Sequence, residues 1–254
     1  MLEYALGHRI HAFSTMRTAG ASQGAYAQFN INPYCGDAPE HVAQNLHSLC
    51  RVLGIAPSNL VMPHQTHETT VRQVGSELLS MPQNVRQMVL DGVDALITNV
   101  PGVCIGVSTA DCIPILLYDA EHHATAAIHA GWRGTVKRIA QNAIAQMRAA
   151  FNTNPRTLRA VIAPGISLQH FEVGDEVYEA FAKAAFPMND IAQRHDKWHI
   201  NLPLCNQLQL QELGVKAENI YATDICTYNR CNDFFSARRL GINSGRIFTG
   251  VTIR

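Results

Sequence analysis

The sequence DALITNVPGVCIGVSTADCIPILLYDAEHHATAAIHAGWRG occupies residues 94–134. Four short apolar runs in it are rich in β-branched residues and are bounded by polar or turn-forming residues, a pattern typical of buried strands. We expect strands at residues 94–98, 103–107, 113–118 and 125–128. After the closing Gly-Trp-Arg-Gly, apolar side chains recur at helical spacing, which predicts one long helix with the stripe Val136, Ile139, Ala143, Met147 and Ala150.

The rest of the chain adds helices and strands around this stretch. A helix is predicted between Asp37 and Gly54, with Asp37 as its N-cap, Pro39 in its first turn and Gly54 ending it. Further helices are expected at residues 175–186 and 202–213, strands at 159–162 and 247–253, and a loop at 15–26. Short strands mixed with helices predict a mixed sheet covered by helices. No repeat or linker divides the sequence, so residues 1–254 are expected to form a single domain.

Composition and charge exclude several classes of protein. Of the 254 residues, 47% are hydrophobic and 16% are charged, which predicts a large buried core rather than disorder. Twenty basic residues balance twenty acidic ones, so neither nucleic acid nor a membrane surface is expected as a partner. The N-terminus lacks the segments of a signal peptide, and no run approaches the roughly 18 apolar residues of a membrane span. Seven cysteines without a C-x-x-C pair are expected to be reduced thiols of a cytoplasmic protein.

Polar clusters stand where the apolar runs end, which is where functional side chains gather. Three of these clusters are Met62-Pro63-His64-Gln65-Thr66-His67, Ser108-Thr109-Ala110-Asp111-Cys112 and His129-Ala130-Gly131-Trp132-Arg133-Gly134. Two imidazoles and a thiolate form a donor set that zinc prefers. The sequence therefore predicts a metal centre built from His67, Cys112 and His129. Three protein ligands leave a fourth position open, as in catalytic zinc sites.

Residue types and spacing leave alternatives open at this site. His64 is almost as well placed as His67 to be a ligand. Cys112 could instead be a nucleophile with His129 as its base. Each of these side chains could also be an ordinary half-buried residue that only bonds backbone or packs in the core.

The C-terminal third holds further candidates. The pair Arg238-Arg239 and the nearby Arg246 could bind a phosphate or carboxylate through bidentate hydrogen bonds. Arg239 and Arg246 are equally compatible with a basic turn between a helix and a strand. Glu172 precedes a predicted helix and could serve as a general acid or base, or simply as a favourable charge at the helix N-terminus.

The order of these motifs resembles a known family. The matching motifs are Gln65-x-His67, Thr109-Ala110-Asp111-Cys112-x-Pro114, His129-Ala130-Gly131-Trp132-Arg133-Gly134, Phe171-Glu172-Val173-Gly174, Cys226-Thr227, Phe235-Ser236-x-Arg238-Arg239 and Gly245-Arg246. Together with Phe13-Ser14-Thr15 they extend over essentially the whole chain. This set resembles the laccase-domain family, also called YfiH-like or peptidoglycan editing factor proteins and formerly multicopper polyphenol oxidases.

The resemblance implies a fold, an activity and a ligand set. The expected fold is α+β, with two mixed β-sheets packed face to face and helices on the outside, in α/β/β/α layers. The expected activity is phosphorolysis of adenosine, inosine, guanosine and S-methyl-5′-thioadenosine, with adenosine deaminase activity. The family's metal-binding and catalytic residues fall on His67, Cys112 and His129, which selects His67 over His64. The sequence departs from the family at Glu68, at Ala163-Pro164, at His170 and in the Arg17-Thr18-Ala19-Gly20 segment.

Deamination follows directly from a zinc site, because a zinc-activated water could attack C6 of adenine. Phosphorolysis also needs a bound phosphate and a proton for the leaving purine. The expected substrate-binding residues are Arg133 and Arg238 for phosphate, Glu172 or Asp111 for acid–base chemistry, and Gln65 for orientation. Purine nucleoside and phosphate are thus the expected partners, and zinc is the expected cofactor, with copper as the alternative. A copper-dependent polyphenol oxidase, a Cys–His hydrolase and a cell-wall editing factor are the alternative functions.

Overall fold

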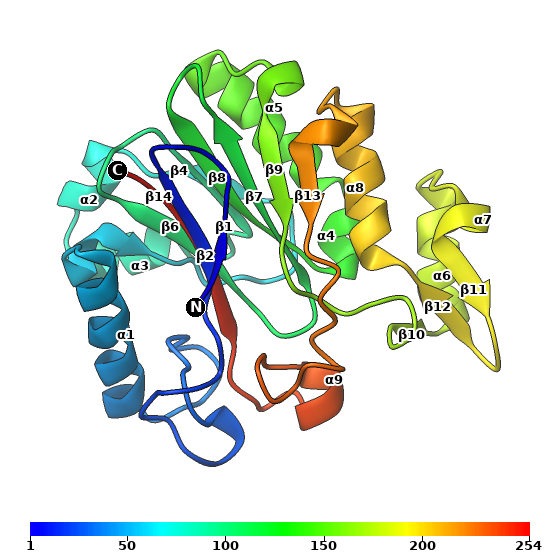
Figure 1. The fold of residues 1–254 in the computed structure, drawn as a ribbon, viewed down its shortest axis with the longest axis horizontal. Helices are drawn as coiled ribbons and strands as arrows, with labels where there is room; N and C mark the ends of the chain where they lie inside the picture. Colours follow the sequence, from blue (N-terminus) through cyan, green and yellow to red (C-terminus); the bar gives the residue numbers. More distant parts are fainter.

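The computed structural model describes all residues, 1–254, and its body is made of two mixed sheets (Figure 1). The six-stranded sheet has the order β13 (Ile220–Ala222), β9 (Arg159–Ile162), β7 (Ile113–Asp119), β8 (Ala124–Ala130), β5 (Ala95–Thr98) and β4 (Val71–Gln73). The five-stranded sheet has the order β1 (Leu2–Tyr4), β2 (Ile10–Ser14), β14 (Ile247–Ile253), β6 (Cys104–Thr109) and β3 (Leu60–Val61). Each sheet contains parallel and antiparallel pairs, so both are mixed.

The four strands predicted within residues 94–134 are all present: β5, β7 and β8 lie in the six-stranded sheet, and β6 lies in the five-stranded sheet. The chain runs along β5 in the six-stranded sheet, crosses to β6 in the five-stranded sheet, and returns to β7. The short connection at residues 110–112 therefore passes from one sheet to the other. Cys112 lies in this connection, at the edge of the core between the sheets.

Three apolar layers hold the architecture together. Inward-facing side chains of both sheets meet in one core, which includes Val61, Leu96, Val107, Leu116, Ala127 and Val251. The outer face of the six-stranded sheet packs against α5 (Ile139–Phe151) and α8 (Leu202–Glu212). The outer face of the five-stranded sheet packs against α1 (Pro39–Leu53) through Phe13, Leu49 and Phe248. The expected α/β/β/α layering is thus confirmed.

A smaller lobe projects from the body, at the right of Figure 1. Its three-stranded sheet has the order β10 (Glu172–Val173), β12 (Trp198–Ile200) and β11 (Ala192–Arg194), and it carries α6 (Asp175–Lys183) and α7 (Met188–Ile191). Buried side chains of the lobe, including Val173, Phe181 and Ile200, belong to the same apolar cluster as β7 and α5. The lobe therefore shares the core of the body.

The remaining elements are short. They are the helices α2 (Ser76–Ser80), α3 (Gln83–Val89), α4 (Trp132–Val136) and α9 (Ala237–Leu240), and the 3-10 turns Gly24–Tyr26, Pro57–Asn59, Pro155–Thr157 and Ala217–Asn219. None of the helices combines the length and the apolarity that crossing a membrane requires. All seven cysteines are free thiols, as expected.

Three local predictions were wrong. The long helix after Gly134 is two helices, α4 and α5, because Arg138 adopts a left-handed backbone conformation with φ of 63°. Its guanidinium donates to Glu212 and to the carbonyl of Ala184, contacts that fix it against α8 and the lobe. The N-cap position of α1 belongs to Ala38 rather than Asp37.

The Asp37 carboxylate accepts hydrogen bonds from groups that precede the helix it was expected to cap, including the N–H of Ala38. It accepts hydrogen bonds from Ser22 Oγ at 2.6 Å and Asn30 Nδ2 at 2.9 Å. Asp37 thus holds the loop that precedes α1 rather than the free N–H groups of its first turn. The helix predicted at 175–186 ends early, at Lys183.

Gly106 lies where β6 and β14 pack too closely to leave room for a side chain. A Cβ at this position would overlap the Phe248 ring and lie 2.7 Å from the carbonyl oxygen of Thr249. We expect Gly106→Ala to lower the free energy of unfolding by about 1–3 kcal/mol, the usual cost of overpacking a core. Gly75→Ala is the control, because a Cβ there has no neighbour within 4 Å and its φ is −113°. Urea unfolding measures both, and equal stability of the two variants would contradict the prediction.

Candidate functional site

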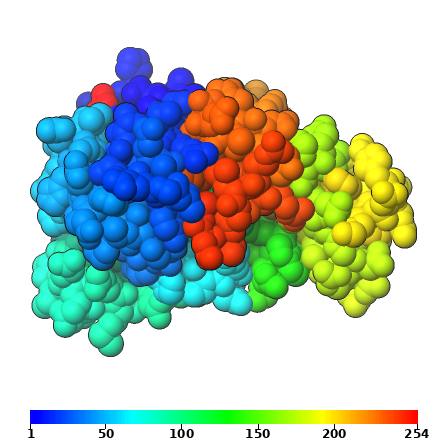
Figure 2. Space-filling model, turned by 90° about the horizontal axis from the view of Figure 1, so that it is seen from below, coloured from blue at the N-terminus to red at the C-terminus, as the bar shows by residue number.

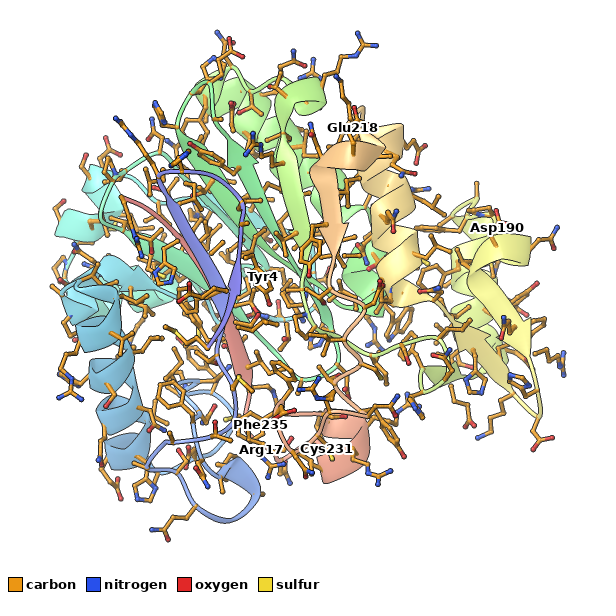
Figure 3. All side chains as sticks on the ribbon, in the orientation of Figure 1. Tyr4, Arg17, Asp190, Glu218, Cys231 and Phe235 are labelled. Atoms are coloured by element: carbon orange, nitrogen blue, oxygen red, sulfur yellow. The ribbon has the colours of Figure 1, made fainter.

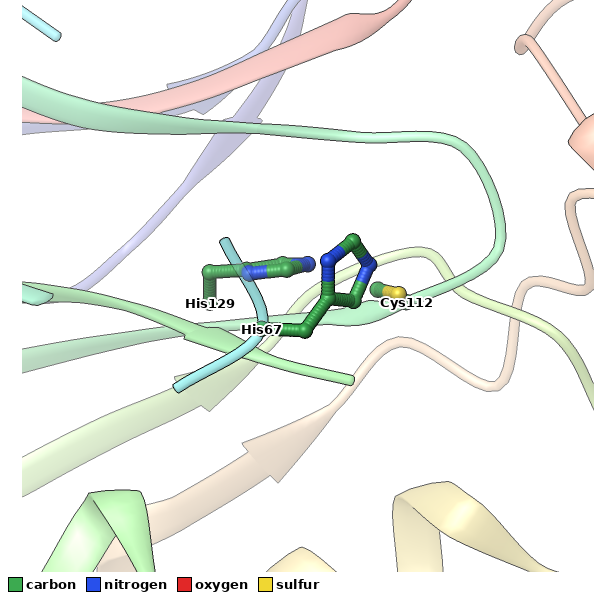
Figure 4. Close-up of side chains that lie close together, drawn as sticks. All are labelled: His67, Cys112 and His129. Carbon is green, nitrogen blue, oxygen red and sulfur yellow. The ribbon is translucent and has the colours of Figure 1, made fainter. Parts of the chain in front are cut away.

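His67, Cys112 and His129 converge from three separate segments (Figure 4). His67 lies in the loop between β3 and β4, Cys112 in the crossing between the sheets, and His129 near the end of β8. One ring nitrogen of each histidine and the Cys112 sulfur all lie within 4.8 Å of one another. The two imidazoles meet edge to face, with ring centroids 4.8 Å apart. The structure thus brings together the three residues predicted to hold a metal.

A buried carboxylate that the sequence analysis missed, Asp94, organises this cluster. Its Oδ1 accepts a hydrogen bond from His129 Nδ1 at 2.7 Å. The backbone N–H of His67 also donates to Oδ1, at 3.0 Å, and the backbone N–H groups of Thr66 and Glu68 donate to Oδ2, at 3.3 and 2.8 Å. His67 takes a left-handed φ of 65°, within a loop that turns three successive N–H groups toward one anion. Asp94 therefore fixes both histidines.

Asp94 and His129 are also joined through their backbones. The His129 N–H donates to the Asp94 carbonyl at 2.8 Å, next to the pairing of β5 with β8. Because Nδ1 of His129 is occupied by Asp94, its Nε2 is the atom left for a metal. The only sequence signal for Asp94 was an acid at the start of a fully buried apolar strand, where a charge must be paired.

Charges at the cluster shift the pKa values of its members. Burial alone would raise the pKa of Cys112, but the charge and hydrogen bonds of His129 and His67 outweigh it, so the pKa falls below the ordinary value of a thiol. Burial alone would lower the pKa of His129, but Cys112 and Asp94 raise it overall. The pKa of Asp94 is lowered, because hydrogen bonds from His129 and the backbone outweigh its burial. Cys112 and His129 therefore favour the thiolate–imidazolium form.

Gly131 keeps the space between the donors open. A Cβ at this position would lie 3.0 Å from His67 Cδ2 and 3.1 Å from Cys112 Sγ. Any larger residue would intrude on the volume that a metal ion needs. The glycine of the His129-Ala130-Gly131 motif is thus explained by space rather than by backbone conformation, since its φ is −68°.

His64 lies outside the cluster, although it is only three residues from His67. Its Nδ1 is 2.6 Å from Asp91 Oδ1, and its ring lies against Tyr34 with centroids 4.3 Å apart. His64 contributes instead to the wall of the neighbouring pocket. Between these two histidines, the geometry favours His67 as the metal ligand.

The cluster opens into a pocket formed by segments from both ends of the chain. Its walls are formed by some of the residues in each of the segments 32–35, 64–67, 108–112 and 237–246, together with His129. In Figure 2 the C-terminal segment, in red and orange, lies beside the N-terminal segment, in blue, on the face seen from below. No Asp or Glu lines the pocket, and Arg246 is its single Lys or Arg.

Two of the predicted substrate-binding residues are held by the protein itself. The Gln65 amide lines the pocket, but it exchanges two hydrogen bonds with the backbone of Ser108, at 2.8 and 2.7 Å. Asp111 accepts from Thr227 Oγ1 at 2.6 Å and from the backbone N–H of Arg238 at 2.7 Å. Both side chains thus position the loops that carry His67 and Cys112.

The other three predicted substrate-binding residues do not line the pocket. Arg133 is exposed, and its guanidinium lies over the Trp132 ring at 4.4 Å. Glu172 pairs with Lys197 at 2.9 Å on the lobe, and the Arg238 guanidinium donates to the Glu172 carbonyl at 3.0 Å. Sequence reasoning named Arg246 only as one alternative, and it missed Tyr34 and Thr109.

Arg17, in the segment that departs from the family pattern, contacts parts of the chain that are far apart in the sequence. Its guanidinium donates to the carbonyls of Ala27 and Cys231 and lies 5.2 Å from the centroid of Phe235. Figure 3 shows Arg17, Cys231 and Phe235 gathered at this junction. Arg17 therefore joins the N-terminal loop to the C-terminal segment.

The lowered pKa of Cys112 can be tested on metal-free protein. Because imidazolium groups stabilise the thiolate, iodoacetamide should alkylate Cys112 with a pH midpoint well below that of an ordinary thiol. Removing that charge in His129→Gln should move the midpoint upward. Peptide mass spectrometry after timed alkylation measures it, with buried Cys205 as the unreactive internal control. An unchanged midpoint in His129→Gln would contradict the assigned cause.

Known proteins resemble the chain over nearly its whole length. A purine nucleoside phosphorylase from Bacteroides thetaiotaomicron is 48% identical over 247 residues, which cover 96% of this chain and 92% of the relative. A protein named adenosine deaminase RL5, from an unknown prokaryotic organism, is 43% identical over 245 residues, covering 95% and 93%. The crystal structure of YlmD from Geobacillus stearothermophilus has a TM-score of 0.89 at 27% identity, covering 97% and 92%.

The family assignment rests on the same extent of similarity. The profile of a family described as multi-copper polyphenol oxidoreductase laccase matches residues 11–254, which contain the whole candidate cluster and its pocket. This match and the identities above confirm the resemblance inferred from the motifs. The chain belongs to this laccase-like family.

Proposed function

We propose that the chain is a zinc-dependent purine nucleoside enzyme. It would catalyse phosphorolysis of adenosine, inosine, guanosine and S-methyl-5′-thioadenosine, and it would deaminate adenosine. The observation that carries the proposal is the convergence of His67, Cys112 and His129 at the end of an open pocket. The relatives named as purine nucleoside phosphorylase and adenosine deaminase support this chemistry.

The three donors suit a zinc ion. A thiolate and two imidazoles match its preferred ligands, and the lowered pKa of Cys112 favours the thiolate form that binds metal. The hydrogen bond from His129 Nδ1 to Asp94 is the contact that a metal-bound histidine usually makes through its other ring nitrogen, and it holds the imidazole in orientation. Gly131 leaves room between the donors. When bound, zinc supplies an electrophile and lowers the pKa of a water in its open position.

The pocket walls provide surfaces for a purine ring. Tyr34 and Ile242 line the pocket and are 42% and 72% exposed, so both offer apolar surface to a ligand. A flat aromatic base stacks well on a tyrosine ring. We therefore place the base between these residues and the metal cluster, with the polar ribose toward the strand ends.

Two other functions use the same residues. The family description favours copper-dependent polyphenol oxidation, but the structure contains one His/Cys cluster with metal-ligand geometry, whereas multicopper chemistry requires several sites. The Cys112–His129 pair also has the charge state of a Cys–His hydrolase. A hydrolase of this kind would keep its activity after removal of metal by a chelator, and the proposed enzyme would lose it.

The function is tested by assaying one preparation for three reactions. Inosine with phosphate should yield hypoxanthine, adenosine without phosphate should yield inosine, and a diphenol with oxygen should give no coloured product. Elemental analysis of the same preparation should find about one zinc per chain, as expected for a single three-ligand site. Diphenol oxidation with several coppers and no nucleoside turnover would replace the proposal by the oxidase.

The two neighbouring histidines give a sharp test of the metal ligands. His67→Ala removes one donor of the cluster, so it should lose zinc and turnover together. His64→Ala removes an imidazole paired with Asp91, so its zinc content should stay at the wild-type level. Zinc is measured after dialysis against a weak chelator. Loss of zinc from His64→Ala with retention in His67→Ala would show that the ligand in this loop is His64.

Asp94→Asn tests the buried carboxylate. The asparagine amide has only one acceptor oxygen, and its NH2 group cannot accept the hydrogen bonds that the second carboxylate oxygen receives. Both histidines should therefore lose their orientation. We expect zinc affinity to fall by about 10–100-fold, the usual effect of removing a group that is hydrogen-bonded to a metal ligand. Asp91→Asn is the matched control, because that exposed carboxylate contacts His64 instead. Competition with a chromogenic chelator measures both, and equal affinities would exclude the role given to Asp94.

A further inference from the structure

Arg246 places a positive charge at the wall of the pocket. Of the twenty Lys and Arg residues in the chain, it alone lines the pocket that contains the metal cluster. No carboxylate lines the same pocket, so the positive charge of Arg246 is not neutralised within it. An uncompensated cation at the wall of a concave site attracts an anionic ligand.

The fold fixes Arg246 in place. It directly precedes β14, the strand in the middle of the five-stranded sheet, and its backbone N–H donates to Asn30 Oδ1 at 3.1 Å. The ladder pairs Ile247 with Thr109, so Arg246 lies next to the end of β6 and the connection that carries Cys112. Its distance from the cluster is therefore set by the sheet.

The Arg246 guanidinium is held by hydrogen bonds within the protein, but these bonds do not use all of its N–H donors. Its Nη1 donates to the carbonyls of Ser244 and Gly245, and its Nη2 donates to Ile242 at 2.9 Å. These three bonds use three of the five N–H donors of a guanidinium. The two that remain, on Nε and Nη2, can form the bidentate pair that arginine makes with a phosphate.

Thr109 adds a second unpaired donor. The residue is 1% exposed and lines the pocket, and its hydroxyl has no hydrogen-bond partner in the protein. Leaving a buried hydroxyl unpaired is costly, so such groups usually serve a ligand or a water. Thr109 pairs with Ile247, the residue that follows Arg246, so the two lining residues come from neighbouring strands at the same end of the sheet.

We propose that Arg246 and Thr109 form the subsite that binds the phosphate substrate. This inference rests on the proposed phosphorolysis and names the residues that make it possible. A phosphate oxygen forms the new bond to C1′ of the ribose while the C1′–N9 bond breaks. The electron pair of that bond goes to the purine, and the proton of hydrogen phosphate ends on the purine nitrogen. The products are ribose 1-phosphate and the free base. Arg133 and Arg238, the arginines suggested by the motifs, lie outside the pocket.

Phosphate kinetics of the purified zinc enzyme test the subsite. Arg246→Gln should raise the KM for phosphate by at least about tenfold, since a hydrogen bond to a charged group is worth about 1.5–3 kcal/mol. The effect should be on KM for phosphate, with much of kcat recovered at saturating phosphate, and Arg246→Lys should recover only part of the affinity. In Arg246→Gln, the rate of adenosine deamination should change by a much smaller factor than the KM for phosphate. Arg156→Gln, which removes one exposed charge far from the pocket, should match the wild type.

The variant Thr109→Val tests the phosphate subsite independently of Arg246. Valine has nearly the same shape, and removing an unpaired buried hydroxyl should leave the stability unchanged or raise it. The variant should nevertheless raise the KM for phosphate several-fold. A variant that is as stable as the wild type and has an unchanged KM would remove Thr109 from the subsite.

Direct binding separates this inference from the proposed function. Inorganic phosphate should raise the Tm of the wild type and of Arg156→Gln, because a ligand of the folded state stabilises it, and it should not raise that of Arg246→Gln. An equal Tm rise in Arg246→Gln, or a wild-type KM for phosphate in that variant, overturns the subsite while phosphorolysis stands. A Tm rise that depends on Arg246 in a wild type without nucleoside turnover supports the anion site and refutes the proposed function.

Discussion

The carboxylate of Asp94 is the contact on which the site depends. It is fully buried, and a buried charge is tolerated only when hydrogen bonds replace its lost water. Four donors do so: His129 Nδ1 and three successive backbone N–H groups of the loop that carries His67. One anion thus sets the orientation of one imidazole and the backbone course of the other. The loop takes its left-handed conformation at His67 because that turn directs the N–H groups inward.

Asp111 has a comparable role on the other side of the cluster. It takes a left-handed φ of 87° in the connection between the sheets, and its two oxygens bind Thr227 and the backbone of Arg238. The connection that presents Cys112 is therefore tied to the C-terminal segment, which also carries Arg246. Two acids thus position the ligands and the pocket wall, and neither lines the pocket. The pocket keeps a positive character in a chain without net charge.

The crossing of the chain between two sheets explains why the site lies where it does. Residues 110–112 leave β6 in one sheet and enter β7 in the other, so their side chains reach the edge of the shared core. The antiparallel partners of these two strands, β14 beside β6 and β8 beside β7, bring Arg246 and His129 to the same edge. The site is thus built on strand ends, where the backbone is rigid and side chains can still face an open pocket.

The sequence by itself determined the strands of residues 94–134, the helix α1 and the donor types of the candidate metal site, because apolar periodicity and donor chemistry are local properties. It did not determine the break at Arg138, which depends on contacts with Glu212 and Ala184 far along the chain. The spacing in the sequence could not show which of His64 and His67 belongs to the cluster. In the fold, Asp91 holds the His64 ring outside the cluster, and Asp94 binds the backbone of His67 within it. The sequence also could not show that Arg246, and not Arg133, lines the pocket. Those choices belong to the tertiary structure, because each is made by pairing between strands or loops that are distant in the sequence.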